Sequence, residues 1–275
     1  MSMETAADMP PPEVKTARPW TFLRIVGYAL MAFWILGGLG VIAFLYNSYD
    51  QEFMDKYGQK FIDGTIVTIQ LVILSVVLGA LVSLPIAFGR LTTNRYIGGL
   101  TYGYVYFFRG TPLIAQVFLI YYGVGSFRPF FQDIGLWWFL RDAWYCALLA
   151  FTLNTAAYQA EILAGAIRNV PEGQSEAARA LGLPRPVMFF KIILPQALIT
   201  ALRPYGNEIV LMLKGSAIVS IITVYDLMGE TRRMFARTYD FQAYLWAAII
   251  YIIVVEGLRR LWDKLEIRLT RHLQR

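Results

Sequence analysis

The uncharged stretch GTIVTIQLVILSVVLGALVSLPIAFG, residues 64–89, decides the fold class. An α-helix rises about 1.5 Å per residue, so roughly 20 apolar residues cross the hydrocarbon core of a bilayer. This stretch is longer than that and predicts a transmembrane helix. A second uncharged stretch, IVGYALMAFWILGGLGVIAFLYNSY at residues 25–49, predicts another. We therefore expect an integral membrane protein.

The composition of the chain agrees with this expectation. Of its 275 residues, 57% are hydrophobic and 16% are charged, whereas a soluble domain has about 45–50% apolar and about 25% charged residues. The single cysteine, Cys146, excludes an internal disulfide framework and a cysteine-rich metal site. The single histidine, His272, excludes a histidine-cluster metal site and argues against a Ser-His triad. The sequence thus offers neither a catalytic residue nor a metal-ligand set.

Four further segments complete a set of six predicted transmembrane helices in an all-α, polytopic membrane fold. They are 96–127, interrupted by Arg109; 143–160; 204–225, containing Glu208 and Lys214; and 241–255. The first helix, 24–49, is longer than the apolar core of a signal peptide and lacks a small-residue cleavage pattern, so we expect it to be retained. Residues 1–23 and 263–275 are predicted to be terminal tails.

The distribution of Lys and Arg predicts that both termini lie in the cytoplasm, because cytoplasmic loops of membrane proteins carry an excess of these residues. With the N-terminus inside, sixteen Lys and Arg fall in inside segments, seven in outside segments and two within spans. This asymmetry accounts for most of the net charge of +6 without a nucleic-acid partner.

The cytoplasmic loop 168–203 is predicted to be a helix–turn–helix. Good helix formers with an early acidic residue fill 176–181, just after Ser175, and Gly182 stands where a helix end needs a left-handed residue. A second short helix is expected over 187–194, before Pro195. This element is either a plain surface hairpin or a slim helix that enters a groove on another protein.

Residues of this loop resemble the EAA loop of ATP-binding-cassette (ABC) importer permeases throughout its length. The matching residues are Glu176, Ala177, Ala178, Gly182, Ile192, Leu194 and Pro195. The resemblance implies that these residues form the contact with the ATPase.

Other motifs narrow the resemblance to permeases for polar amino acids, with the M subunits of histidine permeases and their lysine/arginine/ornithine and opine relatives as the closest likeness. They are FRGTPL at 108–113, LNT at 153–155, AGAIR at 164–168, and NE at 207–208 followed by LMLK at 211–214. The similarity covers residues 60–262. Because these relatives usually have a five-helix core, the resemblance implies that the helix at 24–49 is an addition to it.

The resemblance implies a type I ABC importer transmembrane fold in the bacterial inner membrane. In that family two permease subunits form the pathway, either as a homodimer or with a second, similar subunit, which the M-type likeness favours. A dimeric ATPase binds ATP and magnesium, and a periplasmic solute-binding protein delivers the amino acid. The chain itself contains no Gly-x-x-x-x-Gly-Lys-Ser/Thr phosphate loop, so it is expected to bind no cofactor.

Five polar residues in the predicted spans are candidates for the substrate pathway: Arg109, Thr111, Asn154, Asn207 and Glu208. Arg109 lies roughly 20 Å along a helix that starts near Tyr96, which is mid-membrane. Gly110 and Pro112 follow it and can break the helix there, as in many transport sites.

Arg109 and Glu208 each admit two interpretations. Arg109 can bind a substrate carboxylate, and Glu208 can bind a cationic substrate side chain. Alternatively, they form a fixed ion pair with each other, or Arg109 caps loose carbonyl groups. Lys214 lies about 240° around the helix from Glu208, so it does not share its face and is expected to be architectural.

Two other classes of protein compete with the importer subunit. A secondary transporter would use Arg109 and Glu208 for ion coupling, but such proteins usually show repeated halves, and no repeat is evident. A membrane enzyme would need clustered catalytic groups, which the single histidine and cysteine disfavour.

Overall fold

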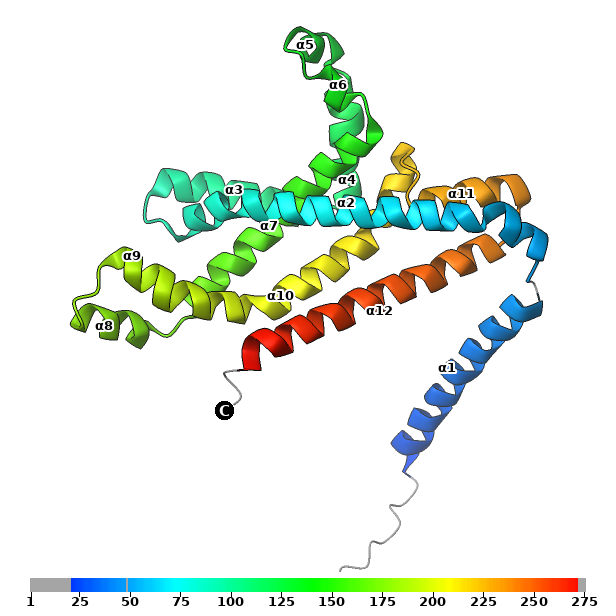
Figure 1. Cartoon of the computed structure of the whole chain (residues 1–275), viewed down its shortest axis with the longest axis horizontal. Coiled ribbons are helices and arrows are strands. Elements are labelled where there is room, and N and C mark those ends of the chain that lie inside the picture. The colour runs from blue at the N-terminus through cyan, green and yellow to red at the C-terminus, as the bar shows by residue number, and fades with distance from the viewer. Residues whose placement is uncertain (1–20, 48, 272–275) are drawn as a thin grey trace, which may run out of the picture. The chain divides into compact units, whose positions relative to one another are not determined.

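The computed structural model describes residues 21–47 and 49–271 (Figure 1). The chain divides into two units, Met1–Tyr49 and Asp50–Arg275, which are described separately. Within the described residues every regular element is helical. The tail predicted over residues 1–23 lies almost wholly outside this range.

The first unit contains one helix, α1 (Phe22–Asn47). It is 26 residues long, which corresponds to about 39 Å and is sufficient to cross a bilayer. Almost all its side chains are exposed, and most of these are apolar. Its length and composition agree with the predicted first span.

The second unit is built around α2 (Gln51–Leu91), a helix of 41 residues. At about 62 Å it is roughly twice as long as the hydrocarbon core is thick. Its packing partner is α7 (Ala143–Arg168). The two backbones approach closely at Gly79, where a Cβ atom would collide with Thr155 of α7. The small residue at this position therefore sets the contact between the two helices.

The third predicted span is broken in the middle. Helix α3 (Arg95–Gly110) ends, Thr111 and Pro112 are extended, and α4 (Leu113–Phe118) begins. The chain continues in a π turn (Leu119–Gly123). Pro112 stands where α4 starts, so its missing N–H breaks no helical hydrogen bond.

A short hairpin follows, made of α5 (Arg128–Asp133) and α6 (Trp137–Leu140). It stands away from α2 at the end where α7 begins (Figure 1). Asp142 then caps α7 by accepting a hydrogen bond of 2.8 Å from the backbone N–H of Trp144.

The loop 168–203 contains the predicted first helix, α8 (Glu172–Ala180), which is followed by Leu181 and by Gly182 with φ +68°. The prediction that the second helix stops before Pro195 is wrong. Helix α9 (Arg185–Met188) passes through a π turn (Phe189–Ile193) directly into α10 (Leu194–Gly215). The wide π turn accommodates the proline ring, which would otherwise collide with a carbonyl group of the preceding turn.

Helix α10 continues as a 3-10 turn (Ser216–Ile222), and α11 (Leu227–Thr238) and α12 (Gln242–Thr270) complete the unit. Helix α10 packs between α7 and α12. The indole N–H of Trp262 on α12 donates to the carbonyl of Leu202 on α10 at 2.8 Å.

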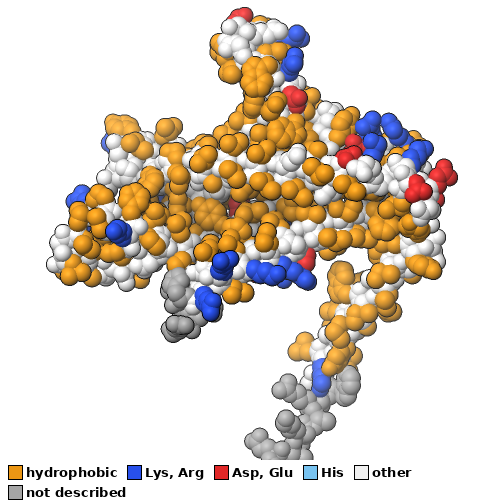
Figure 2. All heavy atoms as spheres, viewed as in Figure 1, with side chains coloured by type: hydrophobic (Ala, Val, Ile, Leu, Met, Phe, Trp, Pro, Cys, Tyr) orange, Lys and Arg blue, Asp and Glu red, His pale blue; other side chains and the backbone are white. Residues whose placement is uncertain are grey.

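Three helical runs of the described residues are long and apolar enough to cross a bilayer, namely α1, α2 and the continuous run 185–222. Helices α7 and α12, at 26 and 29 residues, have sufficient length but carry more polar side chains. Away from the charged first turns of α2, hydrophobic side chains cover most of the visible surface of α2 and of the helices beside it (Figure 2). This surface is suited to lipid.

Candidate functional site

Arg109 lies at the end of α3, next to the break in the third span. It is 14 residues beyond Arg95, which places it about 21 Å along the helix. Its side chain is exposed, and its guanidinium carbon lies 5.1 Å from the ring centroid of Tyr158 on α7. Within the described part of the chain, Arg109 forms no ion pair, so the alternative of a fixed pair with Glu208 is not realised in this structure.

Two buried amide side chains hold the broken helix ends. The side-chain nitrogen of Gln116 on α4 lies 2.9 Å from the carbonyl oxygen of Phe108 and 2.8 Å from Oγ1 of Thr111, to which it donates. Asn154 on α7 donates to the same Phe108 carbonyl at 3.0 Å and to Oε1 of Gln116 at 3.0 Å. The carbonyl groups of Phe108 and Thr111 at the break are therefore satisfied by uncharged donors.

This network assigns structural roles to two of the predicted pathway residues, Asn154 and Thr111. Gln116 was missed by sequence reasoning. Its only signal was an amide four residues after Pro112 in an otherwise apolar run.

Replacing Asn154 by leucine is expected to destabilise the protein by about 1–3 kcal/mol. The Phe108 carbonyl keeps its hydrogen bond from Gln116, but the buried amide oxygen of Gln116 loses the donor that Asn154 supplies, and an unsatisfied buried group costs this amount. Thermal unfolding in detergent, followed by size-exclusion chromatography, measures the loss.

Thr152 on the same helix supplies the matched control. Its hydroxyl is buried and has no hydrogen-bond partner among the residues that the structure describes. Thr152→Val should therefore leave the unfolding temperature nearly unchanged. Equal losses for the two variants would contradict the role assigned to Asn154.

Glu208 on α10 is buried and faces α7. Its Oε1 accepts a hydrogen bond of 3.1 Å from Oγ1 of Thr155, which also accepts from the side-chain nitrogen of Gln159 at 3.1 Å. The Gln159 nitrogen reaches the carbonyl of Val76 on α2 at 3.1 Å. Glu208 is thus the end of a polar chain that crosses α2, α7 and α10.

Asn207 is turned away from this chain. It is exposed and lines a different cavity of about 380 Å³ between α10 and α12. That cavity also contains the ion pair between Arg203 and Glu266, at 2.9 Å. The structure therefore does not bring Asn207 together with Arg109.

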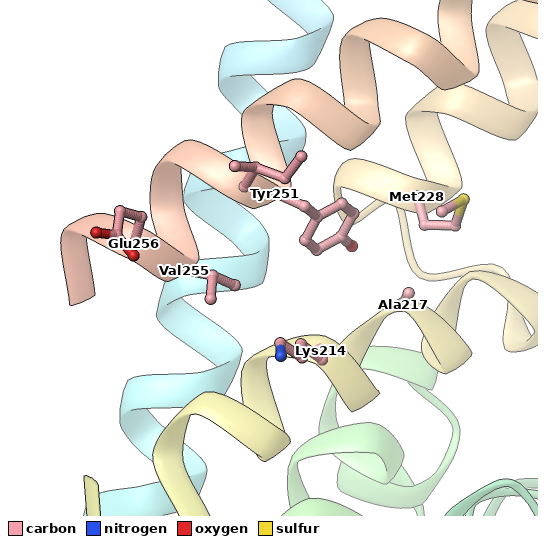
Figure 3. Close-up of a pocket in the computed structure, with 7 residues that line it drawn as sticks. Lys214, Ala217, Met228, Tyr251, Val255 and Glu256 are labelled. Atoms are coloured by element: carbon pink, nitrogen blue, oxygen red, sulfur yellow. The ribbon is translucent and has the colours of Figure 1, made fainter. Parts of the chain in front are cut away.

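Lys214 also lies apart from Glu208, which confirms the expectation that the two side chains do not share a face. Figure 3 shows Lys214 beside a cavity that is bordered across from it by Tyr251 and Glu256 of α12. The cavity has a volume of about 420 Å³ and is largely apolar.

In the loop 168–203, Glu176 and Ala177 are exposed, whereas Ala178 is buried. The end of α8 is fixed by two backbone hydrogen bonds, from Gly182 to the carbonyl of Arg179 at 2.9 Å and from Leu183 to the carbonyl of Ala178 at 3.1 Å. This is the Schellman arrangement, which requires a left-handed residue at the position of Gly182.

The remaining three predicted contact residues, Ile192, Leu194 and Pro195, lie on the π turn and the first turn of α10. They are therefore separated from α8 in sequence, but α8 packs against the π turn. The structure thus brings the two halves of the predicted contact together.

A family model described as "Binding-protein-dependent transport system inner membrane component" matches residues 79–262. The chain belongs to this family. It is the permease component of an ABC transporter, in which a separate subunit hydrolyses ATP. The function class predicted from the sequence is therefore confirmed.

Two curated relatives of this permease are each 42% identical to it. The nopaline transport system permease protein of Agrobacterium fabrum (strain C58 / ATCC 33970) matches over 195 residues, 70% of this chain and 81% of the relative. The histidine/lysine/arginine/ornithine transport system permease protein of Escherichia coli (strain K12) matches over 212 residues, 77% of this chain and 89% of the relative.

Solved structures confirm the predicted fold class of the permease. An amino acid ABC transporter crystallised with histidines is 35% identical with a TM-score of 0.71, and the match covers 80% of this chain and 99% of that one. The methionine ABC transporter MetNI in an inward-facing conformation is 20% identical with a TM-score of 0.65, covering 78% and 98%.

Proposed function

We propose that this permease imports polar, basic amino acids or opines from a periplasmic binding protein into the cytoplasm. The observation that carries the proposal is its 42% identity, over most of its length, to permeases named for nopaline and for histidine, lysine, arginine and ornithine. The intramembrane charges Arg109 and Glu208 support it, because such charges usually line a solute pathway.

Coupling to the ATPase is proposed to run through α8 and α10. The exposed residues Glu176 and Ala177 are available to a groove on the ATPase, as a helix-in-groove contact requires. From the loop, one continuous helical run, 185–222, leads to Glu208 in the membrane. A rigid run of this kind transmits a displacement of the loop to the pathway.

The proposal includes a second permease subunit and a cytoplasmic location for both termini. The excess of Lys and Arg in the inside segments supports this orientation. The second subunit is either another copy of this chain or a similar permease. The exposed Arg109 supports a pathway shared with another subunit, because an unpaired charge is not expected to face lipid.

The decisive experiment is ATP hydrolysis by the permease in lipid nanodiscs, after co-expression with any ATPase and second permease that its neighbouring genes encode. The assay contains the binding protein and one of L-histidine, L-arginine, L-lysine, L-ornithine, nopaline or L-glutamine. We expect one of the basic amino acids or the opine to stimulate hydrolysis several-fold. Stimulation by L-glutamine alone would show that the substrate is a neutral polar amino acid and not a basic amino acid or an opine. Failure of the permease to co-purify with the ATPase would overturn the coupling role of the loop.

A further inference from the structure

A cavity of about 330 Å³ lies between α3 and α7, with the end of α2 at its inner side. Arg90, Tyr102, Arg109, Tyr158 and Glu161 line it. We propose that this cavity binds the carboxylate group of the transported solute on Arg109, with Tyr158 as the residue that positions the guanidinium. The inference rests on the proposed function and assigns the carboxylate site within it.

The cavity runs from the middle of the membrane toward its cytoplasmic side. Arg109 lies about 21 Å from the start of α3. On α7, Tyr158 and Glu161 lie about 15 Å and about 10 Å from the helix end at Arg168. A solute that has reached Arg109 therefore has a path along the cavity toward the cytoplasm.

Among the described residues, Arg109 is the one arginine lining the cavity that forms no salt bridge. Glu161 accepts from Arg90, with 3.0 Å between Nε and Oε2, and lies 3.8 Å from Arg168. Arg168 also donates to the backbone carbonyl of Arg90 at 2.6 Å. Among the described residues, Glu161 is the one carboxylate that lines the cavity, and it is held by two arginines. Glu208 acts on Arg109 electrostatically but forms no salt bridge with it, so the hydrogen-bond donors of the guanidinium remain for a ligand.

The ring of Tyr158 orients Arg109 for a carboxylate. A guanidinium that stacks on an aromatic ring keeps its in-plane N–H groups free for a bidentate contact. At 5.1 Å from the ring centroid, the Arg109 guanidinium is within the range of such stacking. Among the described residues it has no hydrogen-bond acceptor, so its donors are unused.

Size and position favour a small solute over lipid as the ligand. Pockets for small molecules have volumes of about 300–1,000 Å³, and this cavity is at the lower end of the range. Charged side chains at mid-membrane depth usually face a water-filled cavity or another protein surface rather than acyl chains. The ion pair of Arg90 and Glu161 lies at the inner end of the cavity, on the path from Arg109 toward the cytoplasm.

The test is equilibrium binding of radiolabelled L-arginine, L-histidine and L-glutamine to the complete permease–ATPase complex in nanodiscs, without binding protein. We expect Arg109→Gln to weaken binding at least about tenfold, because a charge-assisted bidentate contact is lost. Tyr158→Leu should weaken it roughly threefold to thirtyfold, and Tyr158→Phe should stay within about twofold of wild type. L-argininamide, which lacks the carboxylate, should compete poorly with L-arginine for the wild type.

Tyr96→Leu is the matched control, because Arg95 stacks on Tyr96 at 4.9 Å on the same helix but outside the cavity. Wild-type affinity in Arg109→Gln, or equal losses in Tyr158→Leu and Tyr96→Leu, would overturn the inference. Dissociation of the permease pair by Arg109→Gln on size-exclusion chromatography would also overturn it, since the anion would then come from the other subunit. A wild-type complex that is stimulated by no amino acid with its binding protein would instead contradict the proposed function.

Discussion

Replacing Gly182 by valine is expected to lower substrate-stimulated ATP hydrolysis of the assembled transporter at least about tenfold. At φ +68° the residue is left-handed, a conformation that costs an ordinary residue about 1–2 kcal/mol and a β-branched residue more. To avoid this strain, valine must give up the hydrogen bonds of Gly182 and Leu183 that end α8. The exposed contact residues would then be presented at the wrong angle. ATPase assays of the complex in nanodiscs measure the effect.

The control variant Gly173→Val distinguishes the effect of backbone strain at Gly182 from the effect of added side-chain bulk. Gly173 lies in the same loop, within α8, and a Cβ atom at either glycine would meet no atom within 4 Å. Only Gly182 has a positive φ of the two. The Gly173 variant should therefore keep most of the stimulated activity and co-purify with the ATPase. Full activity in Gly182→Val would show that the end of α8 does not set the docking geometry.

Replacing Glu208 by glutamine is expected to reduce import of basic amino acids about tenfold to a hundredfold. A hydrogen bond to a charged group contributes about 1.5–3 kcal/mol, which corresponds to this range. Glutamine keeps the length of the side chain and an oxygen that can accept from Thr155 at the present distance of 3.1 Å. The loss therefore reports the negative charge rather than the packing. Uptake of radiolabelled L-arginine and L-glutamine into proteoliposomes measures it.

The comparison between these two solutes is the sharper part of this experiment. Uptake of L-glutamine, which has no cationic side chain, should change by less than about threefold. Glu266→Gln is the control, because Glu266 carries the same charge on α12 but pairs with the exposed Arg203. If both solutes lost uptake equally, Glu208 would serve the structure and not the recognition of a cation.

Periodic and local signals predicted much of the fold. The long stretches without charged residues located α1 and the apolar part of α2. The sequence Arg109-Gly110-Thr111-Pro112 located the break in the third span. Gly182 marked the end of α8, since the helix formers before it and the proline after it allow few other conformations. These features depend on interactions between residues close in sequence.

The features that the sequence did not reveal depend on distant partners. Tyr158 is 49 positions from Arg109, and only the packing of α3 against α7 brings the two together. Gln116 acquires its role from Asn154 on another helix. Pro195 suggested a helix end, but the π turn before it allows the helix to continue. Local propensity cannot anticipate such tertiary solutions.

The hydrogen bonds that hold the break between α3 and α4 have an electrical consequence. All donors and acceptors there are amides, a hydroxyl group and backbone carbonyls, from Gln116, Asn154, Thr111 and Phe108. Moving one elementary charge through 100 mV costs about 2.3 kcal/mol, whereas exchanging neutral hydrogen bonds moves no net charge. Exchanging these hydrogen bonds therefore costs the same in an energised and a de-energised cell, so a voltage effect at the break would have to act on the charge of Arg109 beside it.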